Sequence, residues 1–166
     1  PFDHGRSVKK PTPRKRRRRV RSRVEGVEAK GRGSPAKPRR PPPPPSVIDE
    51  RLTQGVALFN QHQFFQCHEV LEQVWLKTTG PSKDFYKGLI QAAVAFYHWS
   101  RGNRPGALTL ARSAARYLTR YQPVYCGLNV EGFLTQFSDL FRWIRRHRQR
   151  FDHHLVPSLR WVGPPR

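Results

Sequence analysis

Residues 82–100 read SKDFYKGLIQAAVAFYHWS, and the pattern of this stretch is the clearest indication of the fold class. Its apolar side chains recur at helical spacing along two sides of one helix. One side carries Phe85, Leu89, Ala92 and Phe96, and the other carries Tyr86, Ile90, Ala93 and Tyr97. A helix that is apolar nearly all round must be covered by other elements. We therefore predict a central buried helix over 82–100.

Two helices are predicted before this stretch. Ser46 can cap a first helix, whose apolar residues between 52 and 59 recur at i, i+4 and i+7. A second helix is predicted over about 63–77. It ends at a Thr-Gly-Pro break, and Ser82 after this break can cap the central helix.

Two more helices are predicted after it. Gly102 and Asn103 end the central helix, and Pro105 suits the first turn of a fourth. Asn129 can cap a fifth. No segment shows the alternating pattern of a strand. The sequence thus predicts an all-α fold, a compact bundle of about five helices with short connections.

Residues 1–45 differ in composition from the rest of the chain. They hold 16 of the 32 Lys and Arg residues, 3 of the 11 Asp and Glu residues and 10 of the 16 prolines, a local net charge of +13. Such a segment buries too little apolar surface to offset its ordering entropy. We expect a disordered tail over 1–45, a helical domain over 46–150 and an irregular C-terminal tail over 151–166.

A dense basic block and a polyproline run lie in the N-terminal tail. The block consists of Arg14, Lys15, Arg16, Arg17, Arg18 and Arg19. It would attract a polyanion by releasing counterions, without reading sequence. The prolines at 41–45 suit a stiff spacer. The block predicts contact with nucleic acid or another polyanion, and a merely solvated tail is the alternative.

Cys67 and Cys126 give no disulfide framework, which suits a reducing cytosol. The longest apolar run, over 88–99, is too short to span a membrane. We expect a cytoplasmic protein, or an organellar one if the basic N-terminus is part of a transit segment. The sequence contains no Met, so we expect the natural start to lie upstream.

Polar residues cluster on the second and third predicted helices. His68 and Glu72 are four residues apart, so they share one helix face. If the two helices pack antiparallel about residue 80, Glu72 lies level with Lys87, and His68 lies level with Gln91. Gly88 would then let the two helices approach closely.

Three interpretations of this cluster stay open. In the first, His68 and Glu72 bind a divalent metal and Glu69 is a possible base, a partial match to the His-Glu-x-x-His helix of metalloproteases. The third ligand would be His98 or Glu69, but His98 lies about 9 Å farther along the helix at ~1.5 Å per residue. A divalent metal is therefore possible but not favoured.

The other two interpretations need no metal. In one, the polar groups line a ligand or catalytic pocket, where neighbouring charges would shift their pKa values. That pocket would be formed by His68, Glu72, Lys87, Gln91, His98 and Arg101. In the other, which we favour, a Glu72–Lys87 pair and a His68–Gln91 hydrogen bond fix the register of the hairpin, because buried polar groups are usually paired.

Five arginines crowd the end of the fifth predicted helix: Arg142, Arg145, Arg146, Arg148 and Arg150. Cations favour the negative end of a helix dipole, so a solvated terminus is one interpretation. Together with Trp143, Phe151 and Trp161, the arginines could also form a surface on which single-stranded nucleic acid stacks.

Several motifs resemble the family catalogued as domain of unknown function 309. The first are Phe59-Asn60 and the run Phe64 to Glu72 followed by Trp75. The others are Phe85, Gly88-Leu89-Ile90-Gln91, His98, Arg101-Gly102-Asn103, Gly106-Ala107 and Tyr121. The resemblance covers roughly residues 49–131 and implies a small all-helical domain with no established activity. Its pattern maps onto the site candidates His68, Glu69, Glu72, Trp75, Gln91 and His98.

The sequence therefore predicts a binding or scaffold module with non-specific polyanion contact through its basic tail. The alternative is a metal-binding or hydrolase-like enzyme built around His68, Glu69 and Glu72, with Lys87 as a further catalytic candidate. The expected binding residues are Trp75, Gln91, His98 and Arg101. Substrate, cofactor and oligomeric state stay open.

Overall fold

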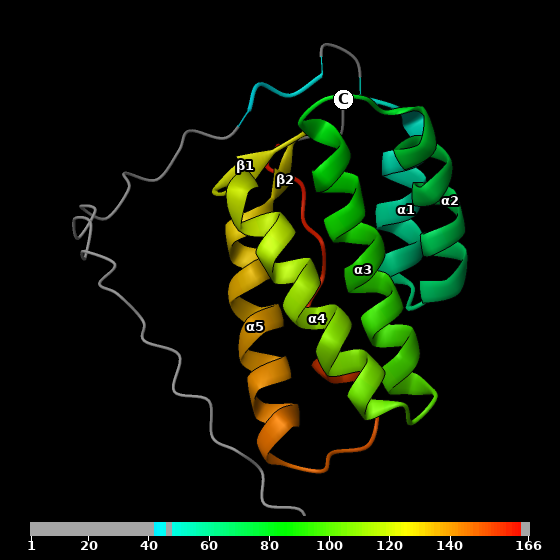
Figure 1. Cartoon of the computed structure of the whole chain (residues 1–166), viewed down its shortest axis with the longest axis vertical. Helices are drawn as coiled ribbons and strands as arrows, with labels where there is room; N and C mark the ends of the chain where they lie inside the picture. The colour runs from blue at the N-terminus through cyan, green and yellow to red at the C-terminus, as the bar shows by residue number, and fades with distance from the viewer. Residues whose placement is uncertain (1–41, 46–47, 164–166) are drawn as a thin grey trace, which may run out of the picture. The chain divides into compact units, whose positions relative to one another are not determined.

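The computed structural model describes residues 42–45 and 48–163. Its five α-helices are α1 (Glu50–Asn60), α2 (Phe64–Lys77), α3 (Ser82–Ser100), α4 (Arg104–Leu118) and α5 (Val130–Arg146). Helices that follow one another in the sequence pack side by side, and Figure 1 shows α3 between α2 and α4. The predicted all-α bundle with a central third helix is confirmed.

Some of the predicted N-cap residues cap their helices, and others do not. The Asn129 side chain accepts a hydrogen bond from the Gly132 amide at 2.8 Å, so the predicted cap of α5 is confirmed. Pro105 lies in the first turn of α4, also as predicted. Asp49 caps α1 instead of Ser46, which lies outside the described residues. Ser82 is the first residue of α3 and does not cap it, because its hydroxyl bonds the Tyr125 hydroxyl at 2.8 Å.

An aromatic cluster holds the bundle together around Phe96 of α3. The ring centroid of Phe96 lies 5.7 Å from that of Phe59 on α1 and 5.3 Å from that of Phe64 on α2. On α5, Phe137 and Phe141 lie at 5.6 and 5.2 Å. Within the described part of the chain, no polar or charged side chain is buried in this core. No helix there is long and apolar enough to cross a membrane.

The seam between α3 and α4 is tight at Gly88. A Cβ at this position would lie 2.7 Å from Cγ of Leu118 and 3.2 Å from Cβ of Tyr117, both on the α4 side. The glycine therefore lets α3 approach α4. The prediction that Gly88 lets α3 approach α2 is wrong. It paired residues by their level along the two helices, and this level does not fix the rotation of a helix about its own axis.

A small hairpin follows α4 and the 3₁₀ turn η1 (Thr119–Tyr121). Strands β1 (Val124–Tyr125) and β2 (Leu128–Asn129) pair antiparallel. The two residues between them, Cys126 and Gly127, have φ of 48° and 78°, as a two-residue hairpin turn requires. The strands are too short to show an alternating pattern, so the sequence does not predict them.

Residues 147–163 return along the bundle through the 3₁₀ turn η2 (His153–Leu155). Leu159 is buried, and its amide donates to Oδ1 of Asn60 at 2.8 Å. In return, Nδ2 of Asn60 donates to the Leu159 carbonyl at 2.9 Å. Trp161 then forms a bridge with Leu128 of β2. This segment is irregular but packed against the end of α1 and the hairpin.

Candidate functional site

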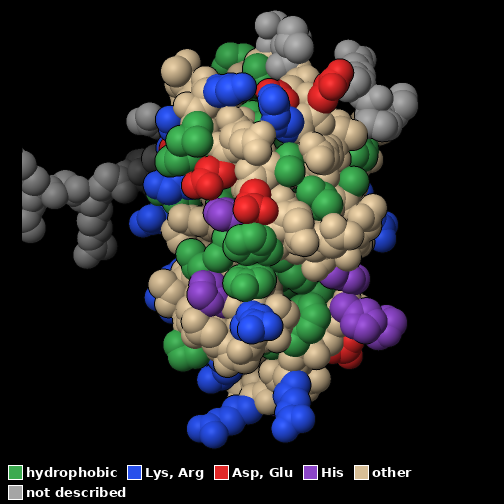
Figure 2. All heavy atoms as spheres, turned by 90° about the vertical axis from the view of Figure 1, so that its right-hand side faces the viewer, with side chains coloured by type: hydrophobic (Ala, Val, Ile, Leu, Met, Phe, Trp, Pro, Cys, Tyr) green, Lys and Arg blue, Asp and Glu red, His purple; other side chains and the backbone are tan. Residues whose placement is uncertain are grey.

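His68 and Glu72 lie on the outward face of α2. Nε2 of His68 is 3.7 Å from Oε2 of Glu72, and the side chains are 27% and 47% exposed. Glu69 is exposed on the same helix. Figure 2 shows carboxylates, histidines and apolar side chains together on this side of the molecule. Because water screens exposed pairs strongly, the two side chains form a solvent-screened surface contact.

Aromatic rings continue this face onto α3. Phe65 is 47% exposed, and its ring centroid lies 6.0 Å from that of His68 and 5.6 Å from that of Tyr97. The next residue, His98, has its Nδ1 2.9 Å from Nδ2 of Asn103, the cap of α4. His98 is thus engaged at the turn between α3 and α4. In the stretches that the structure describes, no three His, Cys, Asp or Glu side chains are grouped to hold a metal ion.

Lys87 and Gln91 do not make the predicted contacts. Nζ of Lys87 lies 5.0 Å from the ring centroid of Tyr117, so this lysine points toward α4. Oε1 of Gln91 is buried without a hydrogen-bond partner among the described residues. The predicted Glu72–Lys87 and His68–Gln91 pairs are wrong, and the reason is the same orientation of α3 that places Gly88 against α4.

Trp75 lies on α2 beside the first turn of α3, whereas Arg101 directly follows the last residue of α3. Nζ of Lys83, in the first turn of α3, is 4.8 Å from the ring centroid of Trp75, whose Nε1 is buried with no partner in the described part of the chain. Arg101 is exposed at the other end of this 19-residue helix. The structure therefore does not bring the two candidate binding residues into one pocket.

The two cysteines are buried and free. Burial raises the pKa of the Cys67 and Cys126 thiols from 9.0 to about 12. Both thiols are neutral at physiological pH, and a neutral thiol is a poor nucleophile. Cys67 therefore serves as a small core residue beneath the His68 face, as the sequence predicts.

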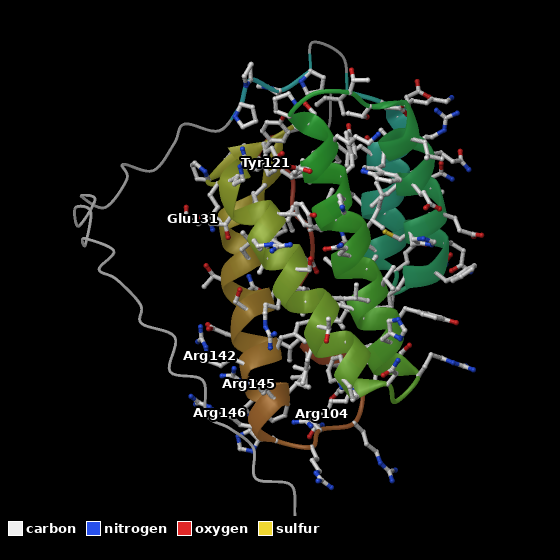
Figure 3. All side chains as sticks on the ribbon, viewed as in Figure 1. Arg104, Tyr121, Glu131, Arg142, Arg145 and Arg146 are labelled. Atoms are coloured by element: carbon white, nitrogen blue, oxygen red, sulfur yellow. The ribbon has the colours of Figure 1, made fainter. Side chains whose placement is uncertain are left out.

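Arginines gather at the end of the bundle where α3 and α5 end and α4 begins. We call this set the arginine end: Arg101, Arg104, Arg142, Arg145, Arg146, Arg148 and Arg150. Figure 3 labels four of them at one end of the molecule, with Glu131 toward the other end of α5. Among the described residues, only Arg142 of this set has an acidic partner, Asp139 at 2.6 Å.

Arg104 fixes the geometry of this end. Its Nε and Nη2 donate to the Ile144 carbonyl at 3.1 and 3.0 Å, and Nη2 also donates to the Arg145 carbonyl at 2.6 Å. The last carbonyls of a helix lack intrahelical partners and carry partial negative charge. The guanidinium therefore caps α5 from the first turn of α4. The sequence contains no signal for this contact, which joins residues 40 apart.

A hollow of about 700 Å³ opens in the arginine end, lined in part by Trp99, Arg104, Arg148, Arg150 and Phe151. The Trp99 indole donates to the Gln149 carbonyl at 3.2 Å, and its ring centroid is 5.0 Å from that of Phe151. The walls are thus basic and aromatic.

The aromatic residues predicted to accompany these arginines are separated in the structure. Phe151 lines the hollow. Trp143 is 38% exposed on α5, with its ring centroid 5.2 Å from that of His147. Trp161, however, pairs with Leu128 at the hairpin and so does not belong to the arginine end.

Comparison with known proteins confirms the resemblance seen in the sequence. Residues 52–110 match the family described as domain of unknown function (DUF309). The uncharacterized protein YpuF of Bacillus subtilis (strain 168) is 44% identical over 57 residues, which are 33% of this chain and 32% of YpuF. An uncharacterized protein of Aquifex aeolicus (strain VF5) is 29% identical over 82 residues, 49% of this chain and 25% of that protein. The matched segments thus span a third or less of each relative's length.

Proposed function

We propose that this chain, whose residues 52–110 carry the DUF309 pattern, is a binding module for a polyanion, in the first place nucleic acid. The arginine end is the observation that carries this proposal. Exposed guanidinium groups from α5 and from the turns beside it face solvent at one end of the bundle, around Arg104, which caps α5. Within the described residues, one carboxylate partly neutralises them.

The chemistry of this end suits a phosphate backbone. One guanidinium group can bind two phosphate oxygens at once, and it stays charged at all physiological pH values. Binding releases the counterions of the nucleic acid, so affinity rises without base-specific contacts. The exposed ring of Trp143 offers a stacking surface for an unpaired base. The formal net charge of +21 further favours encounter with a polyanion.

The basic block at Arg14–Arg19 lies outside the described residues and adds a second contact in this proposal. Its six consecutive cations supply charge that is independent of the folded domain. We propose that it increases affinity for any polyanion and does not select among sequences.

The test measures binding of the full chain to a labelled single-stranded oligonucleotide by fluorescence anisotropy over a range of salt. Replacing Arg145, Arg146 and Arg148 by Ala should weaken binding at low salt about tenfold or more. It should also reduce the magnitude of the slope of log affinity against log salt by about 2. The control replaces Arg116, Arg120 and Arg160, which lie outside the arginine end, and removes the same charge.

Two outcomes contradict parts of the proposal. If the control triple weakens binding as much as the test triple, total charge and not the arginine end carries the binding. If deletion of residues 1–45 leaves low-salt affinity unchanged, the tail has no part in it. A full chain that does not retain the oligonucleotide at low salt contradicts the whole function.

A metal-binding or hydrolytic centre at His68, Glu69 and Glu72 is the second candidate. Only the His68–Glu72 pair favours it, with an imidazole and a carboxylate 3.7 Å apart on one helix face. Two protein ligands fall short of the three that catalytic zinc sites use. Elemental analysis decides the metal version, which requires stoichiometric zinc, iron or manganese in the purified protein.

We also propose a cytoplasmic setting. Free thiols at Cys67 and Cys126 suit a reducing compartment. Imaging of fluorescent fusions with and without residues 1–45 would test this setting against an organellar address in the basic segment.

A further inference from the structure

A furrow runs along the seam between α4 and α5. Its deeper part encloses about 190 Å³ above the apolar side chains of Leu108, Ala111 and Ala115 on α4 and of Phe137 and Phe141 on α5. A second hollow of about 290 Å³ shares Ser138 and Arg142 with the first, and its other walls are mainly polar: Thr119, Gln122, Thr135 and Asp139 beside Leu134. The two hollows together follow the seam from Leu108 to Thr119.

Small side chains leave this furrow unfilled. Ala111 and Ala115 face α5 from α4, and Ser138 faces α4 from α5. On the other side of α4, Leu118 packs directly against the backbone of Gly88, where even a Cβ would not fit. The same helix thus has one filled seam and one open seam.

The floor of the furrow offers no stacking surface to nucleic acid bases. Phe137 is fully buried and Phe141 is 6% exposed, so neither ring offers a free face for stacking. Stacking on exposed aromatic rings is the contact that holds unpaired bases. The deeper hollow has about six times the ~30 Å³ share of one water molecule. Aliphatic side chains of a protein suit such a space.

The rim of the furrow is basic. Arg112 rises from α4, and Arg142 and Arg145 rise from α5. Arg142 is paired with Asp139, whereas Arg112 and Arg145 have no acidic partner in the described stretches. An occupant of the furrow therefore needs carboxylates beside its apolar groups. A second copy of this chain is disfavoured as the occupant, because its net charge of +21 repels the rim. Residues 1–45 are disfavoured for the same reason, because they carry a net charge of +13.

The shape of the furrow suits a helix. The apolar floor runs from Leu108 to Ala115 on α4, about 10 Å at ~1.5 Å per residue, or two helical turns. Helices that bind in grooves insert side chains spaced at i, i+4 and i+7, which span about the same length.

We propose that the α4–α5 furrow binds an acidic amphipathic helix from a partner protein. Its aliphatic side chains lie on the floor, and its carboxylates pair with Arg112 and Arg145 at the rim. This inference goes beyond nucleic-acid binding at the arginine end. The two sites share Arg142 and Arg145, but the apolar floor at Leu108, Ala111 and Ala115 belongs to the furrow alone.

The experiment titrates the full chain into a fluorescent synthetic peptide that carries leucines at i, i+4 and i+7 with glutamates beside them. A scrambled peptide of the same composition serves as the ligand control. Arg112→Glu combined with Arg145→Glu should weaken binding about tenfold or more, because like charges then meet at the rim. Ala115→Trp should weaken it similarly by filling the floor. Arg116→Glu combined with Arg160→Glu makes the same charge change at exposed arginines outside the furrow and the arginine end, and it should change affinity less than about twofold.

Three results overturn the proposal. The peptide does not bind saturably, or the scrambled peptide binds equally well, or the Arg116→Glu and Arg160→Glu double variant weakens binding as much as the rim variant. Circular dichroism checks that each variant is folded, and the rim variants keep the test valid if Ala115→Trp is not. If Ala115→Trp instead abolishes binding of the single-stranded oligonucleotide and spares the peptide, the furrow belongs to nucleic acid and the proposal is wrong.

Discussion

The α2–α3 seam and the α4–α5 seam differ in how completely side chains fill the space between the helices. Between α2 and α3, Phe64 stacks on Phe96 and Phe65 packs on Tyr97, at centroid distances of 5.3 and 5.6 Å. Between α4 and α5, two hollows stay open beneath arginines. The match to the DUF309 family ends at residue 110, within α4. The matched part thus includes the filled seam, whereas the binding chemistry proposed for this chain lies mainly beyond it.

The largest expected loss of stability comes from removing one ring of the aromatic cluster around Phe96. Phe96→Ala should lower the free energy of unfolding by about 3–5 kcal/mol, because it removes a fully buried ring between three helices. Phe65→Ala, at a ring that is 47% exposed, is the matched control and should lower it by less than about 1 kcal/mol. Denaturant titration measures both. Equal losses would mean that the outer aromatic contact is as important as the core.

The second test enlarges one side chain in each seam of α4: Gly88 in the seam with α3 and Ala115 in the furrow with α5. Gly88→Ala should lower the free energy of unfolding by about 1–2 kcal/mol, because overpacking against Leu118 exceeds the gain of about 1 kcal/mol in helix propensity. Ala115→Leu extends into the furrow and should change it by less than about 0.5 kcal/mol. A large loss for Ala115→Leu would show that the furrow is not open.

A third test uses the pH dependence of stability to probe the inner face of α2, at Cys67. Burial raises the pKa of Cys67 to about 12, so the folded state keeps a proton that the unfolded state releases above pH 9. Stability must therefore fall as pH rises from 9 toward 12. From pH 8.5 to 10, the parent should lose about 1 kcal/mol more than Cys67→Ala does. Parallel losses in urea titrations at the two pH values would mean that Cys67 is accessible to water.

The smallest effect is expected at the surface motif. If Glu72 were paired with a buried Lys87, Glu72→Ala would lower stability by about 1–3 kcal/mol. The structure places Glu72 beside His68 with both side chains partly exposed, so the expected loss is less than about 0.5 kcal/mol. Thermal unfolding near pH 7 decides between the two values. A loss above about 1 kcal/mol would indicate that Glu72 belongs to a buried ion pair.

Helix positions could be predicted from the sequence because they depend on local patterns. The apolar spacing of 82–100, Pro105 in a first turn and Asn129 as a cap each act within one or two turns of their own position. The bounds Ser82–Ser100 of α3 agree with the predicted range.

Contacts between helices were predicted less well, because they depend on helix rotation and on residues far apart in the sequence. Lys87 faces Tyr117 and not Glu72, since α3 turns this side toward α4. Arg104 caps α5 across 40 residues, and no local pattern signals it. The furrow depends on small residues from two helices meeting, which neither helix shows alone. The helices that carry the candidate residues were therefore predicted correctly, whereas the predicted Glu72–Lys87 and His68–Gln91 pairs were wrong.

The double hydrogen bond between Asn60 and Leu159 sets an order of events during synthesis. Its two residues are 99 positions apart, so α1 leaves the ribosome long before its partner exists. At about 5–20 residues per second, the side chain of Asn60 waits roughly 5–20 seconds for Leu159. Contacts of such high sequence separation slow folding, since a long loop must close first. The end of α1 therefore stays open to solvent until the last residues of the domain have been made.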